Sequence, residues 1–264
     1  MLFTLSPAGL QEMLTFLSQT ALPLGLRLAP TKCELIVFHR IGTVNKTTLP
    51  IVKLGETVLP WKTSVIYLGS LFTEDGSSLA ATKHRICCAE TVVKRLNPRV
   101  FRRRGVSNRL KGRFVGSAVI ASLLYGLQHC AFGKREQRSL DGYFLRLAKR
   151  VRRLPHDFHL SYIAAERSLG VKRPSTILAR ERLRWLGHVL RSDDAVLTEV
   201  LNFVPEGGAR GRGRPRRRFY DTIKEDLSVR GIIINARDQA GFWLTLANTA
   251  EDRVAWRGIV NAAV

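Results

Sequence analysis

Arginine, the side chain best suited to bind phosphate, is concentrated in two short stretches of this sequence. Three arginines follow one another in the stretch FRRRG: Arg102, Arg103 and Arg104. Residues 207–219 hold six more and no acidic residue: Arg210, Arg212, Arg214, Arg216, Arg217 and Arg218. A guanidinium group stays charged at physiological pH, and its planar fork of N–H donors matches phosphate oxygens. Both stretches therefore predict contacts to a polyanion.

The charge balance of the whole chain points to the same class of partner. Its 264 residues carry 43 Lys and Arg against 21 Asp and Glu, a formal net charge of +22. Residues 99–153 hold fifteen of these cations and only two carboxylates, Glu136 and Asp141. This density exceeds what solubility needs and favours nucleic acid. A membrane partner is disfavoured, because the sequence has no lipidation motif and no isolated basic amphipathic helix.

The four cysteines predict a reduced, intracellular protein. Their spacing matches neither a disulfide scaffold nor a C-x-x-C motif. His84 lies one helical turn before Cys87 and Cys88, but no second ligand pair follows at a zinc spacing. The N-terminus lacks the basic region and cleavage site of a signal peptide. We therefore expect a nuclear or cytoplasmic protein that is not secreted.

Patterns typical of catalytic sites are missing from the sequence. It contains no Walker loop, no nucleophile elbow, no H-E-x-x-H motif and no hairpin with paired carboxylates. Asp193 and Asp194 are adjacent, but they follow a helical pattern that ends at Arg191 and are interpreted as a linker or helix cap. The residues alone predict a nucleic-acid-binding protein with no metal, no cofactor and no visible active site.

These residues must be positioned by a fold that we predict to be α+β and predominantly α-helical. The sequence before residue 75 predicts a helix that begins at Pro7. A strand at 33–39 and further strands around turns at Gly55 and Trp61-Lys62 follow it. The remainder of the chain has the spacing of apolar residues that is typical of helices.

The central basic block is predicted to contain three helices. The second begins after Ser107, a good N-cap, and runs into the uncharged stretch 115–133, which we expect to be a buried helix. Arg109, Lys111 and Arg113 lie near its start. Because a helix N-terminus with added cations is a good seat for phosphate, we expect phosphate contacts there.

The third helix of the block combines an apolar seam with a basic face. The seam has 4-3-4-3 spacing: Leu140, Phe144, Leu147, Val151 and Leu154. The remaining face carries five cations: Arg146, Lys149, Arg150, Arg152 and Arg153. We expect the first three of these cations to contact nucleic acid.

The C-terminal third is interpreted as a further set of helices. Residues 174–191 have a broad apolar face, on which Trp185 is more typical of a core residue than of a base-stacking one. Within 207–219, Arg212 to Pro215 spells the core of an AT-hook, a segment that binds the minor groove of A·T-rich DNA. Because the apolar face of another helix begins at Phe219, we interpret 207–219 as a basic loop leading into an ordered helix.

Six motifs occur in an order that resembles a known family. In chain order they are LQEMLTFLSQTALPLGLRLAPTKCELIVF, VIYLGSLFTEDGS, LLYGLQ, RLRWLGHVLR, GRGRPRRRFYDTIKEDL and DRVAWR. Each motif is only moderately specific, but the succession resembles the C-terminal half of the reverse transcriptase of LINE-type (non-LTR) retrotransposons, an RNA-directed DNA polymerase. The similarity covers almost the entire chain.

This resemblance implies roles for individual residues. Gly25 and Lys32 match polymerase motif D, whose lysine is implicated in handling the incoming nucleotide. Tyr67, Leu68 and Gly69 match motif E, the primer grip. In the family, a helical thumb that follows clamps the template–primer duplex by its backbone, and the basic block corresponds to it. We therefore expect RNA and DNA as partners, bound as a hybrid through their phosphates.

The resemblance also implies a division of the chain into three regions. A partial palm with motifs D and E spans 1–75, a helical basic thumb spans 76–154, and a helical C-terminal region with the Arg-rich loop 207–219 spans 155–264.

One departure from the family bears on activity. The family binds two metal ions with aspartates of motif A and of an aromatic-x-Asp-Asp hairpin, and neither motif occurs in this sequence. Without those carboxylates, attack on a triphosphate lacks its main electrostatic stabilisation. We therefore expect no polymerase activity from this chain alone, with Lys32 as a relic and Mg²⁺ needed only by the complete polymerase. The missing polymerase core is then an expected partner in a longer polypeptide.

Two other interpretations stay open at this stage. One is a stand-alone basic helical module that binds duplex DNA with its AT-hook-like segment. The other is a complete enzyme whose metal site escapes recognition.

Overall fold

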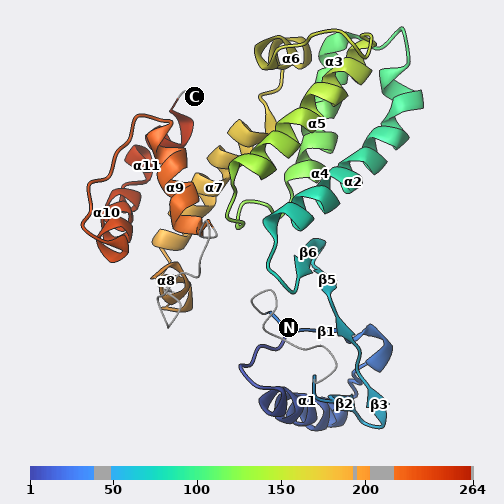
Figure 1. Ribbon diagram of the computed structural model, residues 1–264, viewed down its shortest axis with the longest axis vertical. Coiled ribbons are helices and arrows are strands. Elements are labelled where there is room, and N and C mark those ends of the chain that lie inside the picture. Colours follow the sequence, from blue (N-terminus) through green and yellow to red (C-terminus); the bar gives the residue numbers. More distant parts are fainter. Residues whose placement is uncertain (39–48, 193–194, 203–216, 263–264) are drawn as a thin grey trace. The chain divides into compact units, whose positions relative to one another are not determined.

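The computed structural model describes most of the chain (Figure 1). The described ranges are 1–38, 49–192, 195–202 and 217–262. The chain divides into two compact units, Met1–Ala81 (unit 1) and Thr82–Val264 (unit 2). Helices dominate and strands are few and short, which confirms the predicted α+β, predominantly α-helical fold class.

Unit 1 begins with the helix α1 (Pro7–Ala21). The Ser6 hydroxyl accepts a hydrogen bond from the Gly9 N–H group at 3.1 Å, which caps the helix as the sequence predicts. Two 3₁₀ turns follow, η1 (Leu22–Leu24) and η2 (Pro30–Lys32). The Gln11 side-chain amide reaches from α1 to a strand edge, donating to the Lys53 carbonyl at 2.9 Å and accepting from the Lys53 N–H group at 2.8 Å.

Three two-stranded sheets make up the rest of the described part of unit 1. The strands are β1 (Leu35–Ile36), β2 (Lys53–Leu54), β3 (Thr57–Val58), β4 (Trp61–Lys62), β5 (Ser64–Tyr67) and β6 (Ser70–Thr73). β1 pairs with β4 in parallel, whereas β2–β3 and β5–β6 are antiparallel hairpins. The predicted turn at Gly55 is confirmed, since it joins β2 to β3 with φ 59°.

The predicted turn at Trp61-Lys62 is wrong. These two residues form β4, opposite Leu35 and Ile36. The Trp61 Nε1–H group donates to the Pro50 carbonyl at 2.9 Å, which holds the side chain in an extended segment. Aromatic residues favour strands, and here a partner from an earlier segment is present.

The core of unit 1 is small. Its buried residues are Leu14, Leu35, Val52, Leu54 and Leu59. Large apolar side chains elsewhere in the unit stay exposed among the described residues: Phe3, Leu5, Phe16, Leu24, Ile51 and Leu68. A unit with so few buried residues and only two-stranded sheets gains little stability from its own packing.

Unit 2 is helical throughout most of its described residues. The elements of its first part are α2 (Ser78–Leu96), whose first turn belongs to unit 1, the π-helix η4 (Asn97–Phe101), α3 (Asn108–Phe114), the π-helix η5 (Val115–Ile120), α4 (Ala121–Leu124), α5 (Lys134–Arg152) and α6 (Tyr162–Leu169). Four of the five predicted seam residues are buried on α5, with Leu140, Phe144, Leu147 and Val151 at most 1% exposed. The prediction is wrong for Leu154, which is half-buried and lies beyond the end of α5 at Arg152. α5 packs against both α6 and the next helix, α7.

The buried helix predicted over 115–133 is only partly correct. The helical run ends at Leu124, where Tyr125 leaves the helical conformation with ψ 123° and Gly126 adopts φ 71°. Residues 125–133 then form a non-helical segment, which we call the linking segment. Its Leu127 and Phe132 are nevertheless buried. The absence of charge therefore reflects burial of the segment rather than a continuous helix.

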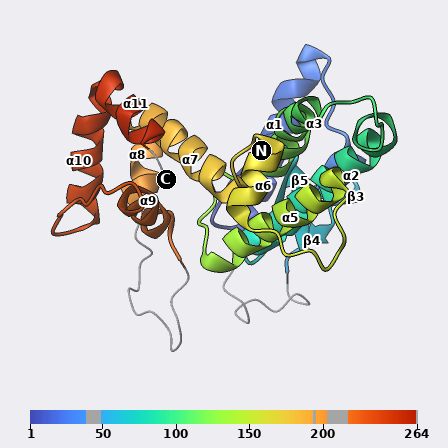
Figure 2. The same ribbon diagram turned by 90° about the horizontal axis from the view of Figure 1, so that it is seen from above.

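The second part of unit 2 is built around a long helix. Its elements are α7 (Pro174–Leu190), α8 (Ala195–Asn202), α9 (Phe219–Ser228), α10 (Gln239–Glu251) and α11 (Arg253–Asn261). Both views show α9 and α11 gathered beside α7, and α10 packs on α7 and α11 (Figure 1 and Figure 2). Trp185 packs on this core, with T-shaped contacts to His129 and Phe219, so its prediction as a core residue is confirmed.

α7 and α11 approach each other closely at a glycine. The buried Trp256 indole of α11 donates from Nε1 to the Leu183 carbonyl of α7 at 3.0 Å. A Cβ atom on Gly187 would overlap this indole ring. The glycine of RLRWLGHVLR and the second tryptophan-bearing motif, DRVAWR, therefore meet in the core.

A buried ion pair joins α7 to α9. Arg182 is 2% exposed, and its Nη1 forms a salt bridge with Asp226 Oδ2. The guanidinium also lies over the Phe132 ring of the linking segment, 5.4 Å from the ring centroid. Arg230 donates to the Asp226 carbonyl at 2.7 Å. The pair thus connects two helices and the linking segment at one buried point.

We predict that Asp226→Asn destabilises unit 2 strongly. The substitution leaves the Arg182 charge buried without a counter-charge, which costs about 3–5 kcal/mol in comparable sites. Denaturant unfolding followed by tryptophan fluorescence measures this, because Trp185, Trp243 and Trp256 all lie in unit 2. Glu181→Gln, which breaks an exposed salt bridge with Arg184, is the control and should change stability by less than about 1 kcal/mol. Equal effects of both substitutions would contradict the prediction.

Candidate nucleic-acid interface

Six arginines lie exposed on one short segment of unit 2, residues 99–113, which we call the arginine segment. They are Arg99, Arg102, Arg103, Arg104, Arg109 and Arg113. The segment comprises the end of η4, a non-helical connection and α3. Five of these residues are predicted from the sequence. Arg99 escapes that prediction, although counting every cation between Asn97 and α3 would have found it.

Packing explains why these arginines face outward. η4 buries Val100 and Phe101, which leaves the flanking positions at the surface. The Ser107 hydroxyl accepts from the Leu110 N–H group at 3.3 Å, so the predicted N-cap of α3 is confirmed. Arg153, just after α5, donates from Nη2 to the Arg102 carbonyl and ties the connection to the end of α5. The non-helical connection from Arg102 to Ser107 is therefore held at both ends.

The carboxylates nearest in the sequence are used elsewhere. Glu90 forms a salt bridge with Arg150 and accepts from the Tyr143 hydroxyl at 3.3 Å. Glu136 accepts from the Gly133 N–H group at 2.9 Å at the start of α5. Among the described residues, no carboxylate forms a salt bridge with the arginine segment, so the described part of the chain leaves its charge uncompensated.

Asp141, the remaining carboxylate of this region, acts as a cap for α7. Its two oxygens accept from the Ser175 N–H group at 3.0 Å and from the Ser175 hydroxyl at 2.7 Å. Burial raises the pKa of this carboxyl, while the Ser175 hydrogen bonds and the charge of Arg173 act in the opposite direction. Asp141 therefore joins α5 to α7 and does not neutralise the arginine segment.

Lys111 differs from the arginines beside it. It is only 7% exposed, whereas Arg109 and Arg113 are exposed. α3 packs against α6 at this point, and a Cβ atom on Gly112 would overlap the Leu169 carbonyl at the end of α6. Because this close approach covers Lys111, the phosphate contact predicted for it from the sequence is not available at the surface.

The three cations predicted on α5 are used in different ways. Arg150 is committed to Glu90, and the Lys149 Nζ donates to the His156 carbonyl at 2.8 Å. Burial and the charge of Glu90 raise the pKa of Tyr143, which shares that carboxylate. Arg146 is exposed and has no salt bridge with a described residue. Of the three, Arg146 is the one whose charge is not paired within the described protein.

In unit 1, Tyr67, Leu68 and Gly69 lie at the tip of the β5–β6 hairpin. Tyr67 pairs with Ser70, so Leu68 and Gly69 form a two-residue turn with φ values of 48° and 79°. A left-handed backbone is unfavourable for leucine, and the Leu68 side chain is 73% exposed. The hairpin therefore presents an apolar residue in a strained turn to its surroundings.

Lys32, matched to motif D, ends η2 and is exposed. It forms no salt bridge with a described carboxylate. Its role stays an expectation from the resemblance.

Most of the Arg-rich stretch falls in the range that the structure does not describe. Arg210, Arg212, Arg214 and Arg216 lie outside the described residues, as do Asp193 and Asp194. Arg217 is half-buried, forms a salt bridge with Glu225 and donates from Nε to the Thr222 hydroxyl at 3.2 Å. The buried Thr222 hydroxyl also accepts from the Phe132 N–H group at 3.1 Å.

The end of this stretch is thus part of the fold rather than a loose tail. Arg218 precedes α9, and its N–H group donates to Asp221 Oδ2 at 2.9 Å. Arg217 forms a salt bridge with Glu225, whereas the exposed arginines of the arginine segment have no salt bridge with a described carboxylate. The helix predicted after the stretch is confirmed, with Ile223 and Leu227 buried.

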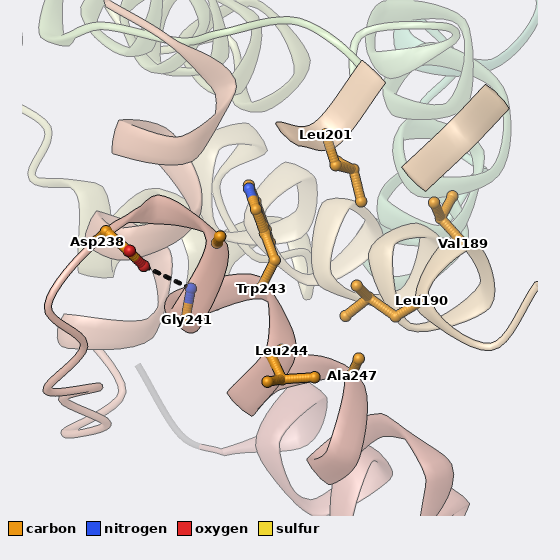
Figure 3. A pocket seen from close by; sticks show the side chains of 9 residues that line it. Val189, Leu190, Leu201, Asp238, Gly241, Trp243, Leu244 and Ala247 are labelled. Atoms are coloured by element: carbon orange, nitrogen blue, oxygen red, sulfur yellow. Dashed lines mark hydrogen bonds between the residues drawn. The ribbon is translucent and has the colours of Figure 1, made fainter. Parts of the chain in front are cut away.

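A pocket of approximately 540 Å³ lies among α7, α8 and α10, where Figure 3 shows mostly apolar side chains. Its one carboxylate, Asp238, accepts from the Gly241 N–H group at 2.7 Å as the N-cap of α10. The buried Trp243 Nε1–H group has no partner among the described residues. The described residues that line the pocket therefore provide no set of groups for acid–base or nucleophilic chemistry.

Metal ligands do not gather in the described part of the chain. It holds no group of three or more His, Cys, Asp or Glu side chains placed to bind a metal ion. His84 Nε2 and Cys88 Sγ are 3.6 Å apart, but they form a pair without further ligands. None of the described helices combines the length and apolar character that a membrane crossing requires.

Comparison with known proteins gives no match, whether to a family model, to a curated protein or to a solved structure.

We predict that Gly112→Ala lowers the stability of unit 2, because the added methyl group must push α3 away from the Leu169 carbonyl. Overpacking of this kind costs about 1–3 kcal/mol. Gly105→Ala is the matched control, since its Cβ would meet nothing within 4 Å. Denaturant unfolding compares the two variants, and an unchanged midpoint for Gly112→Ala would show that α3 and α6 do not pack as described.

Proposed function

We propose that unit 2 binds nucleic acid through the phosphate backbone, with the arginine segment as the principal contact. The observation that carries this proposal is the exposure of six arginines within residues 99–113 without a salt bridge to any described carboxylate. Arg150 and Arg217 are paired with carboxylates, so their guanidinium groups are less available to a ligand. The arginines of the arginine segment have no such partner among the described residues.

Electrostatics explains why a polyanion is the partner that fits. Like charges this close repel one another, and a folded chain that keeps them together is destabilised unless counter-ions or a ligand gather there. A nucleic acid releases its own condensed cations when arginines take their place, which gives an affinity that falls steeply with salt. Contacts of this kind position a duplex without reading its bases.

The order of the six motifs supports a more specific form of the proposal. In it, the chain is a fragment of a LINE-type reverse transcriptase that binds template RNA and primer DNA and performs no chemistry by itself. The exposed tip formed by Tyr67, Leu68 and Gly69 is consistent with contact to a primer strand. Mg²⁺ belongs to the complete polymerase in this proposal, and the polymerase core is the further partner.

The second candidate function is binding of A·T-rich duplex DNA by the AT-hook-like stretch. The observation that favours it is the anchoring of Arg217 and Arg218 on α9, which fixes one end of the Arg-rich stretch to a folded unit. The two candidates use different arginines, so substitutions can separate them.

We predict that Arg103→Gln/Arg104→Gln weakens binding to an RNA/DNA hybrid and flattens its salt dependence. Removing one phosphate contact lowers the log–log salt slope by about 0.9, so the double variant should lose about two units. Arg253→Gln/Arg257→Gln removes the same charge from exposed positions on α11 and should leave the slope nearly unchanged. Fluorescence anisotropy over a series of salt concentrations measures both. If both variants lost the same amount of affinity and salt slope, binding would depend on the net charge of the chain and not on the arginine segment.

A second prediction separates the two candidate functions. Replacing Arg210, Arg212, Arg214 and Arg216 by glutamine keeps the chain length and leaves the contacts of Arg217 intact. If the arginine segment is the principal contact, this variant retains most of its affinity for hybrid duplex. An AT-hook binder would instead lose its preference for A·T-rich over G·C-rich DNA, which competition between the two duplexes detects.

A further inference from the structure

Ser107 lies in the middle of the arginine segment and is exposed. It occupies the non-helical connection between η4 and α3, with an extended backbone at φ −62° and ψ 152°. Its hydroxyl accepts from the Leu110 N–H group, and the described residues provide no acceptor for the hydroxyl proton. The side-chain oxygen is therefore both reachable and chemically available.

The sequence before Ser107 has the pattern that basic-directed protein kinases read. Arg104 lies three residues before the serine, and Arg103 and Arg102 precede it directly. Such kinases bind an extended substrate segment and recognise arginine on its N-terminal side with acidic groups. All three arginines are exposed and residues 102–107 are not helical, so a kinase cleft can reach both them and the serine.

We propose that Ser107 is a phosphorylation site for an arginine-directed serine/threonine kinase, and that its phosphorylation switches off nucleic-acid binding by the arginine segment. The regulatory part rests on the proposed function. In the reaction, Ser107 Oγ attacks the γ-phosphorus of ATP, a new O–P bond forms and the bond to the β-phosphate oxygen breaks. ADP leaves, and the hydroxyl proton passes to the catalytic aspartate of the kinase.

Tertiary structure selects this serine over others with a similar sequence. Among the described residues, Ser175 and Thr176 also have a basic residue three positions earlier, Lys172 and Arg173. Both lie in the first turn of α7, and the Ser175 hydroxyl donates to Asp141 Oδ2 at 2.7 Å. A helical backbone and an engaged hydroxyl do not fit an extended substrate cleft.

The effect on binding follows from charge. A phosphoserine carries about −1.5 to −2 charges at neutral pH and offers three strong acceptor oxygens. Arg103, Arg104 and Arg109 lie within four residues of Ser107, so the phosphate can bind them in cis. Arginines paired with this phosphate are no longer available to the backbone of a nucleic acid. Modification at one side chain thus changes the charge of the whole segment.

The first arm of the experiment tests the modification. The full chain is incubated with ATP and a purified kinase that selects arginine three residues before the acceptor, and the product is mapped by mass spectrometry. We expect phosphate at Ser107 and none at Ser175 or Thr176; Thr43, which has Arg40 three residues before it, is mapped separately. Ser107→Asn is the matched control, because asparagine caps a helix as well as serine does and cannot be phosphorylated in this way. Absence of phosphate from Ser107 would overturn the proposal.

The second arm measures binding of the phosphorylated chain to a hybrid duplex at about 0.1 M salt, where charges still interact over about 10 Å. We expect affinity to fall at least about tenfold and the salt slope to drop by about two units. Ser107→Asp keeps the cap and adds one charge, so its affinity should lie between those of Ser107→Asn and the phosphorylated chain. Equal affinity of the phosphorylated and unmodified chains would overturn the switch.

The two arms of the experiment distinguish a failure of this proposal from a failure of the proposed function. If the unmodified chain binds no nucleic acid, the proposed function and the switch both fail, whatever the kinase does. If the unmodified chain binds and its salt slope falls in Arg103→Gln/Arg104→Gln, the proposed function stands, and only the response to phosphorylation decides the switch.

Discussion

The buried ion pair between Arg182 and Asp226 is the contact on which the second unit depends. A charge taken out of water must find an opposite charge and hydrogen bonds, so α7 and α9 cannot separate without leaving one charge uncompensated. Phe132 lies beneath the same guanidinium, which draws the linking segment to this point. The end of the Arg-rich stretch is fixed at the same place. Arg217 donates to the buried Thr222 hydroxyl, and this hydroxyl accepts from Phe132 of the linking segment, so the start of α9 is held against the linking segment.

Residues of three sequence motifs pack on or within α7, the helix that carries Arg182. Arg182 opens RLRWLGHVLR, Asp226 belongs to GRGRPRRRFYDTIKEDL, and Trp256 of DRVAWR packs at Gly187. Arg182, Asp226 and Trp256 therefore contribute to the buried interior of unit 2. The same residue type has two uses here: arginine paired and buried stabilises the fold, whereas arginine exposed on residues 99–113 supplies charge for a partner.

Periodicity predicted the helices that pack by one apolar stripe, because a buried stripe imposes its own spacing on the sequence. The seam of α5 is an example, from Leu140 to Val151. Periodicity failed where burial does not require a helix. The uncharged stretch 115–133 leaves the helical conformation at Tyr125, since Phe132 is buried by contacts from α7 and α9. Trp61 likewise became a strand residue because β1 lies beside it.

The sequence by itself determined the net charge, the concentration of arginine and the fold class, since these depend on composition and local spacing. Only the tertiary structure decided which cations are available. Lys111 is covered because α3 meets α6 at Gly112, and Arg217 is neutralised by Glu225, whereas Arg103 and Arg104 stay exposed. Whether a charged side chain faces water or an opposite charge depends on residues that are distant in the sequence. A local sequence pattern therefore cannot predict it.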